Sequence, residues 1–457
     1  MATPLPDPWD EAYASPGHPR AEYADVLGAL AELDLPECAE RMTADLRERG
    51  VWIGVPDFFR LDPVPRLLRA AEWAHVERGA LQRVRALEAF VADAHGARRI
   101  VDAGRVPARV IDRSPLYEPD LTGAPVPAGG AIALAGLDLA RGPDGRFRVL
   151  EDNLRTPTGW YYAGVAREVG DARLELPATG RRPLLDPAYD ALADALRGAA
   201  PDGRGDPSIV LLSDGPANSA WFEQKEIARR LAIPLVALED LKAGGPSGLR
   251  ARVEGQPRPV DVLYRRTDED RLRDARGRPT ALARLVLGPL RRGTLACVNA
   301  FGAGVADDKL AHVYVEEMVR FYLGEEPILP SVVGWDLAEP AARAEVLERL
   351  GELVVKPRVE AGGTGVLIGP HASAEQLEHA ARAIRTDPEN WIAQETIVLS
   401  RHPTFTPDGL RPRHVDLRPL VTGGTVVDGA LTRAAVDGSM VVNLSRGGAA
   451  KDTWLVR

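Results

Sequence analysis

The first hundred residues carry the spacing of amphipathic helices. Residues 20–50 and 64–95 are rich in Ala, Leu, Arg and Glu, and their apolar positions recur three and four apart. In the second stretch this spacing places the following side chains on one face: Leu67, Leu68, Ala71, Trp73, Leu81, Val84, Leu87 and Phe90. An apolar face this broad is typical of a helix packed on a core, so residues 1–98 are expected to form a mainly helical region.

From about residue 99 the pattern changes to short β-like runs broken by glycine and proline. Two of these runs, 131–139 and 147–150, flank the turn Pro143-Asp144-Gly145 and predict a β-hairpin. A helix is expected over 186–199, and the Gly/Pro/Asp-rich stretch that follows marks a boundary. We therefore treat 99–200 as one structural unit.

The next unit, 207–300, alternates apolar runs with a helical segment. The run SIVLLSD is continuous and apolar, as expected of a buried parallel strand, and PLVALEDL and VDVLYRR follow as further strands. The helical segment between the first two of these runs makes the pattern that of a βαβ unit.

The last unit, 301–457, begins with helical patterns and ends with strands. Helices are expected over 306–323, near 339–350 and over 373–386, and the strand LVVKP precedes the Gly-rich segment VEAGGTGVLIGP. The remaining residues return to a β-rich pattern. The chain as a whole is expected to have a mixed α/β (α+β) fold.

Composition narrows the function classes. Hydrophobic residues make up 45% and charged residues 27%, the balance of a globular enzyme, and the net charge of -9 argues against a nucleic-acid partner. The two cysteines, Cys38 and Cys297, cannot build a disulfide framework or a thiolate cluster. Neither a secretory signal nor an apolar run of membrane-spanning length is evident, so we expect a cytoplasmic protein without a membrane partner.

Oxygen ligands gather on the predicted hairpin. Glu151 and Asn153 are two apart and share one face of a strand, and the hairpin can bring Asp138 alongside them. Two carboxylates and an amide oxygen suit Mg²⁺ held together with substrate phosphates. A solvated acidic strand face is the plainer alternative, and spacing alone favours it.

Lys356 ends the strand LVVKP, and the glycine-rich loop at 362–365 follows it. Glycines allow successive N–H groups to wrap phosphate oxygens, and a lysine adds a point charge. Lys309 is a second candidate phosphate ligand, or an ordinary surface lysine. No Walker loop and no GxGxxG motif is present.

A third group of polar residues lies near the C-terminus. Arg418 and Arg433 can clamp a phosphate or a carboxylate in bidentate fashion, and Asn443 and Lys451 follow them along the chain. A lone arginine on a strand is more often a surface residue.

The order of these pieces resembles that of the circularly permuted ATP-grasp family, of the second permuted type. In that family the D…ExN piece precedes the lysines, the glycine loop, the QE-type hinge and the arginine. The matching segments run from about 105 to the C-terminus and include GLDLARGPDGRFRVLEDNLRTPTG, NAFGAGVADDKL, FYLGEEPILP, VVKPRVEAGGTGVLIGP, AQETIVLS, RHVDLRPLV and MVVNLSRGGAAKDTW.

The resemblance implies a role for each matched residue. Residues 99–200 correspond to the Mg-binding part of the ATP-grasp domain, 301–457 to its ATP-binding part, and 207–300 to a pre-ATP-grasp-like substrate subdomain. The implied ATP ligands are Lys309, Lys356, Gly362, Gly363, Thr364, Gly365, Gln394, Glu395 and Val398. The implied ligands of two Mg²⁺ ions, with Mn²⁺ as an alternative, are Asp138, Glu151 and Asn153. Arg433, Asn443 and Lys356 are the implied catalytic groups around the transferred phosphoryl group.

The substrate candidates are scattered. Asn218 and Glu223 lie at a helix start that can hold a carboxylate, and Arg265 and Arg266 can pair with it. Arg155 and Lys451 complete the set.

The resemblance implies an ATP- and Mg²⁺-dependent ligase. It would join a small carboxylate, expected to be an amino acid and in particular glutamate, to an amine through an acyl phosphate. The alternatives are a small-molecule kinase and a nucleotide-binding module without turnover. The partners are then small molecules, and a homodimer is an open alternative.

Overall fold

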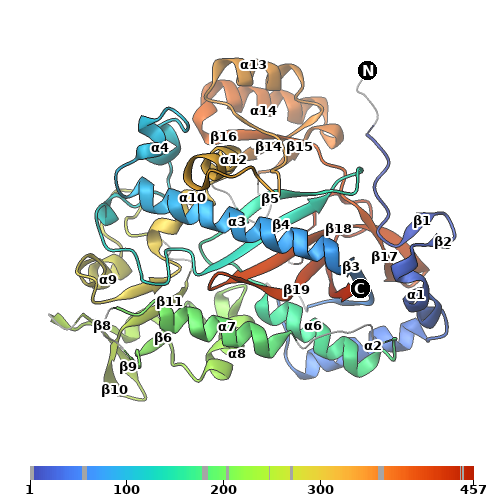
Figure 1. Ribbon diagram of the computed structural model, residues 1–457, viewed down its shortest axis with the longest axis horizontal. Helices are drawn as coiled ribbons and strands as arrows, with labels where there is room; N and C mark the ends of the chain where they lie inside the picture. The colour runs from blue at the N-terminus through green and yellow to red at the C-terminus, as the bar shows by residue number, and fades with distance from the viewer. Residues whose placement is uncertain are drawn as a thin grey trace.

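A large mixed sheet at the centre of the molecule joins the two ends of the chain (Figure 1). The computed structural model describes residues 5–53, 59–177, 184–201, 205–245, 248–267, 271–358, 365–442, 444 and 447–456. The strands of this sheet lie in the order β3 (Leu61–Arg69), β20 (Ala449–Val456), β19 (Thr425–Ala434), β18 (Gly409–Thr422), β4 (Leu134–Arg141) and β5 (Phe147–Asn153), and β17 (Arg401–Thr406) pairs with β18. Neighbouring strands are antiparallel except β3 and β20, which are parallel.

Strand β3 differs from the helix expected over 64–95. The helix α3 (Ala70–Ala94) begins only at Ala70, and the residues before it form an almost fully buried strand. Pro63 and Pro65 explain the difference, because proline lacks the N–H that a helix interior needs and disfavours helical geometry in the residue before it. The N-terminal region therefore contributes a strand to the central sheet as well as helices.

The remaining N-terminal elements pack beside this sheet. They are β1 (Tyr13–Ser15), β2 (His18–Pro19), α1 (Ala24–Ala31) and α2 (Leu35–Glu48). The segment before them lies along β17, because Glu11 N donates to Arg401 O (2.9 Å) and Arg401 N donates to Trp9 O (2.8 Å).

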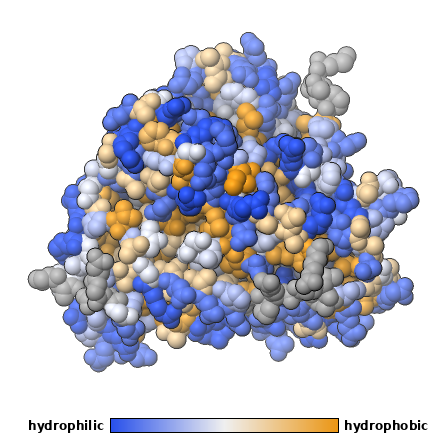
Figure 2. Space-filling view, in the orientation of Figure 1, coloured by the Kyte–Doolittle hydropathy of each residue, from blue (hydrophilic) through white to orange (hydrophobic). Residues whose placement is uncertain are grey.

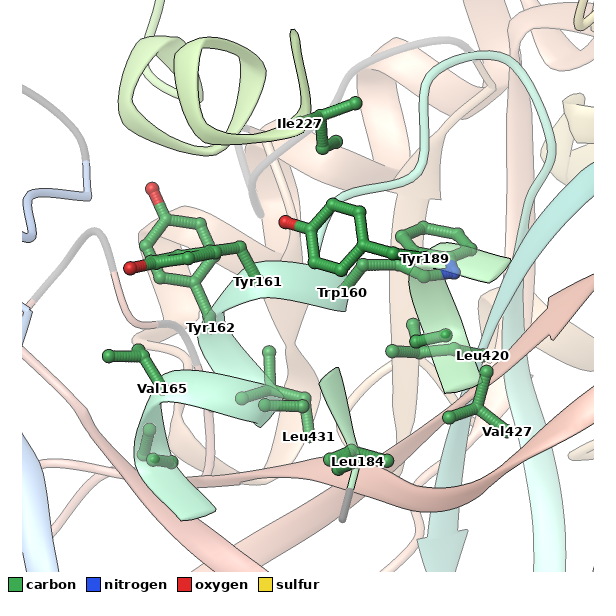
Figure 3. Packing of buried hydrophobic residues seen from close by; sticks show 14 of the residues in the cluster. Trp160, Tyr161, Tyr162, Val165, Leu184, Tyr189, Ile227, Leu420, Val427 and Leu431 are labelled. Atoms are coloured by element: carbon green, nitrogen blue, oxygen red, sulfur yellow. The ribbon is translucent and has the colours of Figure 1, made fainter. Parts of the chain in front are cut away.

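The two faces of the central sheet have different cover. Helix α3 lies over one face, where its apolar residues share a core with Leu137, Leu139, Leu417 and Val421. The other face packs on α6 (Trp160–Arg173) near β19 and β20. Figure 3 shows the aromatic side chains at the start of α6, Trp160, Tyr161 and Tyr162. They belong to the same apolar cluster as Tyr189 of α7, Leu420 of β18 and Leu431 of β19. Asp138 on β4 and Glu151 and Asn153 on β5 belong to neither apolar core and line a cavity instead.

The predicted β-hairpin is confirmed. β4 and β5 pair antiparallel, with Asp138 opposite Glu151 and Gly136 opposite Asn153. The turn includes Gly145 at φ 75°, a left-handed conformation that glycine adopts without strain.

The unit 207–300 contains the expected parallel sheet. Its order is β12 (Ala296–Val298), β11 (Val262–Arg266), β6 (Ile209–Ser213) and β7 (Leu235–Val236), and all its pairs are parallel. The helices around it are α7 (Leu185–Gly198), α8 (Trp221–Leu231) and α9 (Ala281–Arg291), and β8 (Leu241–Ala243), β9 (Leu249–Val253) and β10 (Gln256–Val260) form a separate antiparallel sheet.

A smaller antiparallel sheet forms the upper lobe in Figure 1. Its strands lie in the order β13 (Gly334–Asp336), β16 (Trp391–Glu395), β14 (Leu353–Pro357) and β15 (Leu367–Ile368), with α13 (Pro340–Glu348) and α14 (Ala374–Thr386) packed on it. The expected helix over 306–323 is a series of short helices: α10 (Gly304–Asp307), α11 (Lys309–Val313), α12 (Val315–Met318) and a π-helical turn at Val319–Leu323. Two further short helices are α4 (Arg99–Asp102) and α5 (Arg109–Asp112).

The surface is mostly hydrophilic at its margins. Figure 2 shows apolar side chains gathered in a band across the middle of one face, below the lobe that carries α13 and α14. None of the helices in the described ranges combines the length and the apolar character that a membrane span requires.

Candidate functional site

A cavity of about 320 Å³ lies where the small sheet of the upper lobe faces the end of the central sheet. Its charged and amide side chains come from six strands and one helix: Asp138, Glu151, Asn153, Lys309, Lys356, Gln394, Glu395, Asp416, Arg418 and Arg433. A larger cavity, of about 590 Å³, is lined mostly by alanine, glycine, proline and other apolar residues. The smaller cavity is therefore the candidate site, because charged groups from separate segments converge on it.

The three predicted metal ligands lie together at one end of this cavity. Residues directly opposite one another in an antiparallel pair have Cβ atoms about 4.5–5.5 Å apart, and Asp138 and Glu151 stand in that relation. Asn153 donates from Nδ2 to the Gly136 carbonyl (3.1 Å), so the amide oxygen is the atom left to hold a metal. This hard, all-oxygen set fits Mg²⁺.

Two arginines hold the Asp138 carboxylate. Arg418 donates to both of its oxygens (2.6 and 2.9 Å), and Arg433 Nη2 lies 2.9 Å from Oδ2. Burial alone would raise the pKa of Asp138, but the charges of Arg418 and Arg433 outweigh it and the pKa lies well below its usual value. Gly136 makes room for this pairing, since a Cβ at that position would lie 3.1 Å from Arg418 Cδ.

Glu151 is paired with one of the predicted phosphate-binding lysines. Lys309 Nζ lies 2.9 Å from Glu151 Oε1. Burial would raise the pKa of Glu151, but the charges of Lys309 and Lys356 together with the Lys309 hydrogen bond outweigh it, so the pKa is lowered and the carboxylate stays ionised.

Lys356 extends from β14 into the same cavity. Burial lowers the pKa of Lys356, and the carboxylate of Glu151 opposes this shift. A buried ion pair fixes Lys309 and Lys356 relative to each other, because Arg358, two residues after Lys356, donates to both oxygens of Asp308 (2.8 Å each). Asp308 in turn caps α11, which begins with Lys309.

The glycine loop lies largely outside the described residues. Gly362, Gly363 and Thr364, and also Asn443, are not among them, so their predicted roles stay predictions. Gly365 is described; its φ is 69°, and a Cβ there would lie 2.9 Å from Pro357 Cγ. Both facts favour glycine at this position.

The predicted hinge forms another wall of the cavity. Gln394 and Glu395 line it from β16, and Glu395 pairs with Arg349 (2.8 Å). Val398 is buried but does not line the cavity, whereas its neighbours Ile397 and Leu399 do. The apolar wall comprises Leu150, Val354, Val366, Ile368, Ile397, Leu399, Met440, Val441 and Val442, a surface suited to a flat heterocyclic ring.

Arg266 and Glu223 do not line the cavity, and both make buried contacts around the start of α6. Glu223 is fully buried and accepts hydrogen bonds from Gly159 N (2.9 Å) and Tyr161 N (3.1 Å), so it caps the start of α6. Burial raises its pKa, although the Arg266 charge opposes the shift. Arg266 donates to the Pro157 carbonyl, to Thr158 Oγ1 and to Glu223.

Arg265 and Arg266 do not converge on one ligand. Adjacent strand residues point to opposite faces of a sheet, and Arg265 stacks over Phe301 at 4.6 Å, away from Glu223. Arg265 is 1% exposed, and its three guanidinium nitrogens have no hydrogen-bond partner within the described part of the chain.

The other predicted substrate residues lie outside the cavity lining. Arg155 pairs with Asp307 (3.0 Å), and Asn218 accepts hydrogen bonds from Ala220 N (2.9 Å) and Gln224 Nε2 (2.8 Å). Lys451 is buried; its ammonium contacts Asp62, the Val64 carbonyl (3.3 Å) and the Pro403 carbonyl (3.0 Å). These three acceptors match the three N–H donors of a lysine.

Asp416 is a cavity residue that the sequence analysis missed. It lies opposite Arg433 in the β18–β19 pair, and its carboxylate accepts from Arg433 Nη2 (2.5 Å) and Nε (3.0 Å). Burial raises its pKa, against the pull of Arg433. The signal was present, because Asp416 stands two residues before Arg418 and therefore shares its strand face.

Comparison with known proteins gives relatives over almost the whole chain. A Frankia alni protein named "Putative glutamate--cysteine ligase 2-3" is 41% identical over 470 residues, which cover 99% of this chain and 54% of the relative. An uncharacterized Synechocystis protein is 37% identical over 467 residues, covering 98% and 97%. The chain thus spans about half the length of the Frankia protein and nearly all of the Synechocystis protein.

A glutathione synthetase-like effector from Globodera pallida shares the fold, with a TM-score of 0.60 and 12% identity over 93% of this chain and 98% of that one. A family model described as "Circularly permuted ATP-grasp type 2" matches residues 65–435, a range that contains all the charged residues lining the cavity. The chain belongs to the circularly permuted ATP-grasp family, type 2.

Proposed function

We propose that this protein is an ATP- and Mg²⁺-dependent ligase that joins a small carboxylate to an amine through an acyl phosphate. Enzymes of the ATP-grasp family use ATP and Mg²⁺. One observation carries the proposal. The cavity places the hard oxygen ligands Asp138, Glu151 and Asn153, two lysines and the Gln394–Glu395 hinge around one space, although these residues come from segments far apart in the chain.

The charges in the cavity suit phosphoryl transfer. Mg²⁺ held by the oxygen ligands would neutralise charge on the phosphate oxygens. Lys309 and Lys356 would stabilise the same charge, and Arg418 and Arg433 lie beside the Asp138 carboxylate. Asp416 orients the Arg433 guanidinium, so that its position is set before substrates bind.

The reaction balances without a side-chain nucleophile. A substrate carboxylate oxygen attacks the γ-phosphorus, the bond to the bridging oxygen of ADP breaks, and an acyl phosphate forms. The amine nitrogen then attacks the acyl carbon, the carbon–oxygen bond breaks, and phosphate leaves as the amine loses a proton. No serine or cysteine nucleophile is needed, in keeping with the charged and amide groups that line the cavity.

Glutamate is the proposed carboxylate, with cysteine as the first amine to test. The name of the Frankia relative supports this choice. Arg265 is the proposed ligand of a substrate carboxylate: among the described residues its buried guanidinium has only the weak acceptor Cys297 beside it, and such a charge is costly unless an anion joins it. An unchanged KM for every amino-acid substrate in R265A would contradict this assignment.

The test is ADP and phosphate release from ATP and Mg²⁺ with pools of amino acids and amines, followed by mass spectrometry. ADP together with a product lighter by one water than its two parts supports the ligase. ADP with a phosphorylated product, formed without an amine, supports a kinase instead. Nucleotide binding without turnover in any pool supports a binding module.

A further inference from the structure

A buried histidine lies directly behind the nucleotide cavity. His312, on α11, is 3% exposed, and its Nε2 atom has no hydrogen-bond partner among the described residues. A buried polar nitrogen without a hydrogen-bond partner destabilises the folded state, so native proteins usually give such an atom a partner or a bound water.

The other ring nitrogen is fixed. His312 Nδ1 lies 2.7 Å from Asp152 Oδ2, and Arg83 holds both oxygens of Asp152 (2.6 and 2.8 Å). Nδ1 also lies 3.1 Å from Arg83 Nη2, but Arg83 Nη2 already donates to Asp152 Oδ2 and the shorter Nδ1 contact is to the carboxylate. An ionised carboxylate only accepts hydrogen bonds, so Nδ1–H donates to Asp152. Burial lowers the pKa of His312, which favours the neutral ring with the lone pair on Nε2.

Nε2 is therefore the ring nitrogen that can still accept a hydrogen bond. His312 lines a small internal cavity of about 10 Å³, which it shares with Glu151, Lys309 and Lys356. His312 lies three residues after Lys309 on a helix, so the two side chains share one face of α11. The cavity volume is about that of one water molecule, and its polar lining supplies the two or more partners that a buried water needs.

We infer that His312 is a positioning residue of the nucleotide site, whose Nε2 accepts a hydrogen bond from a water molecule that also binds the Lys356 ammonium and Glu151. This inference rests on the proposed function, because it assigns His312 to the support of a phosphate-binding lysine. Lys356 makes no ion pair with a carboxylate of the described residues, whereas Lys309 already pairs with Glu151. The water held by His312 gives Lys356 a fixed acceptor and so holds its ammonium toward the phosphates.

The first test is the affinity for the Mg²⁺ complex of a non-hydrolysable ATP analogue, measured by calorimetry. H312F removes the acceptor and is expected to weaken binding about 5- to 100-fold, the range for an unpaired buried polar group. H312Q carries an acceptor oxygen and is expected to bind within a few fold of wild type. H75F replaces an exposed histidine on α3 and serves as the control, with binding unchanged.

Each outcome decides a different claim. Analogue binding by H312F equal to wild type, with only a lower melting temperature, would show that His312 merely packs. Absence of analogue binding in the wild type would contradict the proposed function and this inference together. If H312F does not fold, ¹⁵N-histidine NMR of the wild type decides: Nε2 is expected to be unprotonated and to shift on addition of the Mg²⁺–analogue complex. A protonated Nε2, or a signal that ignores the analogue, would overturn the inference.

Discussion

Two clusters of oppositely charged residues lie at the central sheet, with similar residues and different surroundings. The cavity cluster consists of Asp138, Glu151, Lys309, Lys356, Asp416, Arg418 and Arg433. The sealed cluster adjoins it, since Arg66 donates to the Asp416 carbonyl (2.9 Å), and consists of Glu11, Asp62, Arg66, Glu72, Arg141 and Lys451. Both are held by short ion pairs.

The two clusters differ in whether their charged groups line a cavity. In the sealed cluster Lys451 and Arg66 are 0% exposed and bond only to protein acceptors. In the cavity cluster every member lines an open space, and Lys356 pairs with no described carboxylate. Charge and burial alone therefore do not mark a functional site; convergence on a cavity does. Substitutions in the cavity cluster should lower activity, and substitutions in the sealed cluster should lower stability.

Loss of a metal ligand should have the largest effect on turnover. E151Q keeps the shape of the side chain but removes its charge, so turnover should fall by about 10²- to 10³-fold or more. The melting temperature and the circular dichroism spectrum should stay close to wild type. E375Q, an exposed change on α14, serves as the control. Near-normal turnover in E151Q would remove Glu151 from the metal site.

Loss of Lys356 should weaken nucleotide binding. K356M removes a charge that faces the cavity, and we expect the Kd of Mg²⁺–ATP to rise by about 10-fold, or roughly 1.4 kcal/mol. K242M, which alters an exposed lysine on β8, should bind as wild type does. Equal affinities in the two variants would place Lys356 outside the nucleotide site.

Loss of the sealed lysine should affect stability. K451M leaves the buried Asp62 charge without its partner, which costs about 3–5 kcal/mol in the free energy of unfolding. The double variant D62N/K451M removes both charges and should recover part of this loss in urea titrations. The folded fraction of K451M should retain the wild-type Kd for Mg²⁺–ATP. A raised Kd would return Lys451 to the site.

The smallest expected effect is one of pH. Burial alone would raise the pKa of Glu72, but its contacts with Arg69 and Arg141 together outweigh burial and lower the pKa from 4.5 to about 2. A lowered pKa stabilises the fold above the unfolded value near 4.5, and this contribution disappears as the pH falls toward 2. E72Q should lose about 1 kcal/mol at pH 7, after allowance for solvent screening, and a smaller amount at pH 3. A loss that does not change with pH would show that the ion pairs of Glu72 contribute nothing.

Local patterns predicted the hairpin and the parallel strands. They also singled out charged and amide residues that line the cavity, namely Asp138, Glu151, Asn153, Lys309, Lys356, Arg418 and Arg433, whereas Gln394 and Glu395 followed only from the family resemblance. Asp138, Glu151 and Asn153 could be placed because a turn and a two-residue spacing fix their face. Strand β3 could not, because its apolar spacing fits a helix as well as a strand, and only its prolines separate the two.

The substrate residues could not be predicted because partners far apart in the chain decide their roles. Lys451 and Asp62 are 389 positions apart, and Glu223 caps a helix that begins 63 residues earlier in the chain. No spacing rule reaches across such separations. Asp416 was within reach of the two-residue rule that identified Glu151 and Asn153.

The most direct measurement of the central claim is isotope transfer from the substrate carboxylate. The acid that supports ADP release is labelled with ¹⁸O in its carboxylate and supplied with ATP, Mg²⁺ and the amine, and the phosphate is analysed by mass spectrometry. An acyl-phosphate ligase transfers one ¹⁸O atom to each phosphate formed. Phosphate without label, at full turnover, would show that water or another group attacks the γ-phosphorus and would contradict the account.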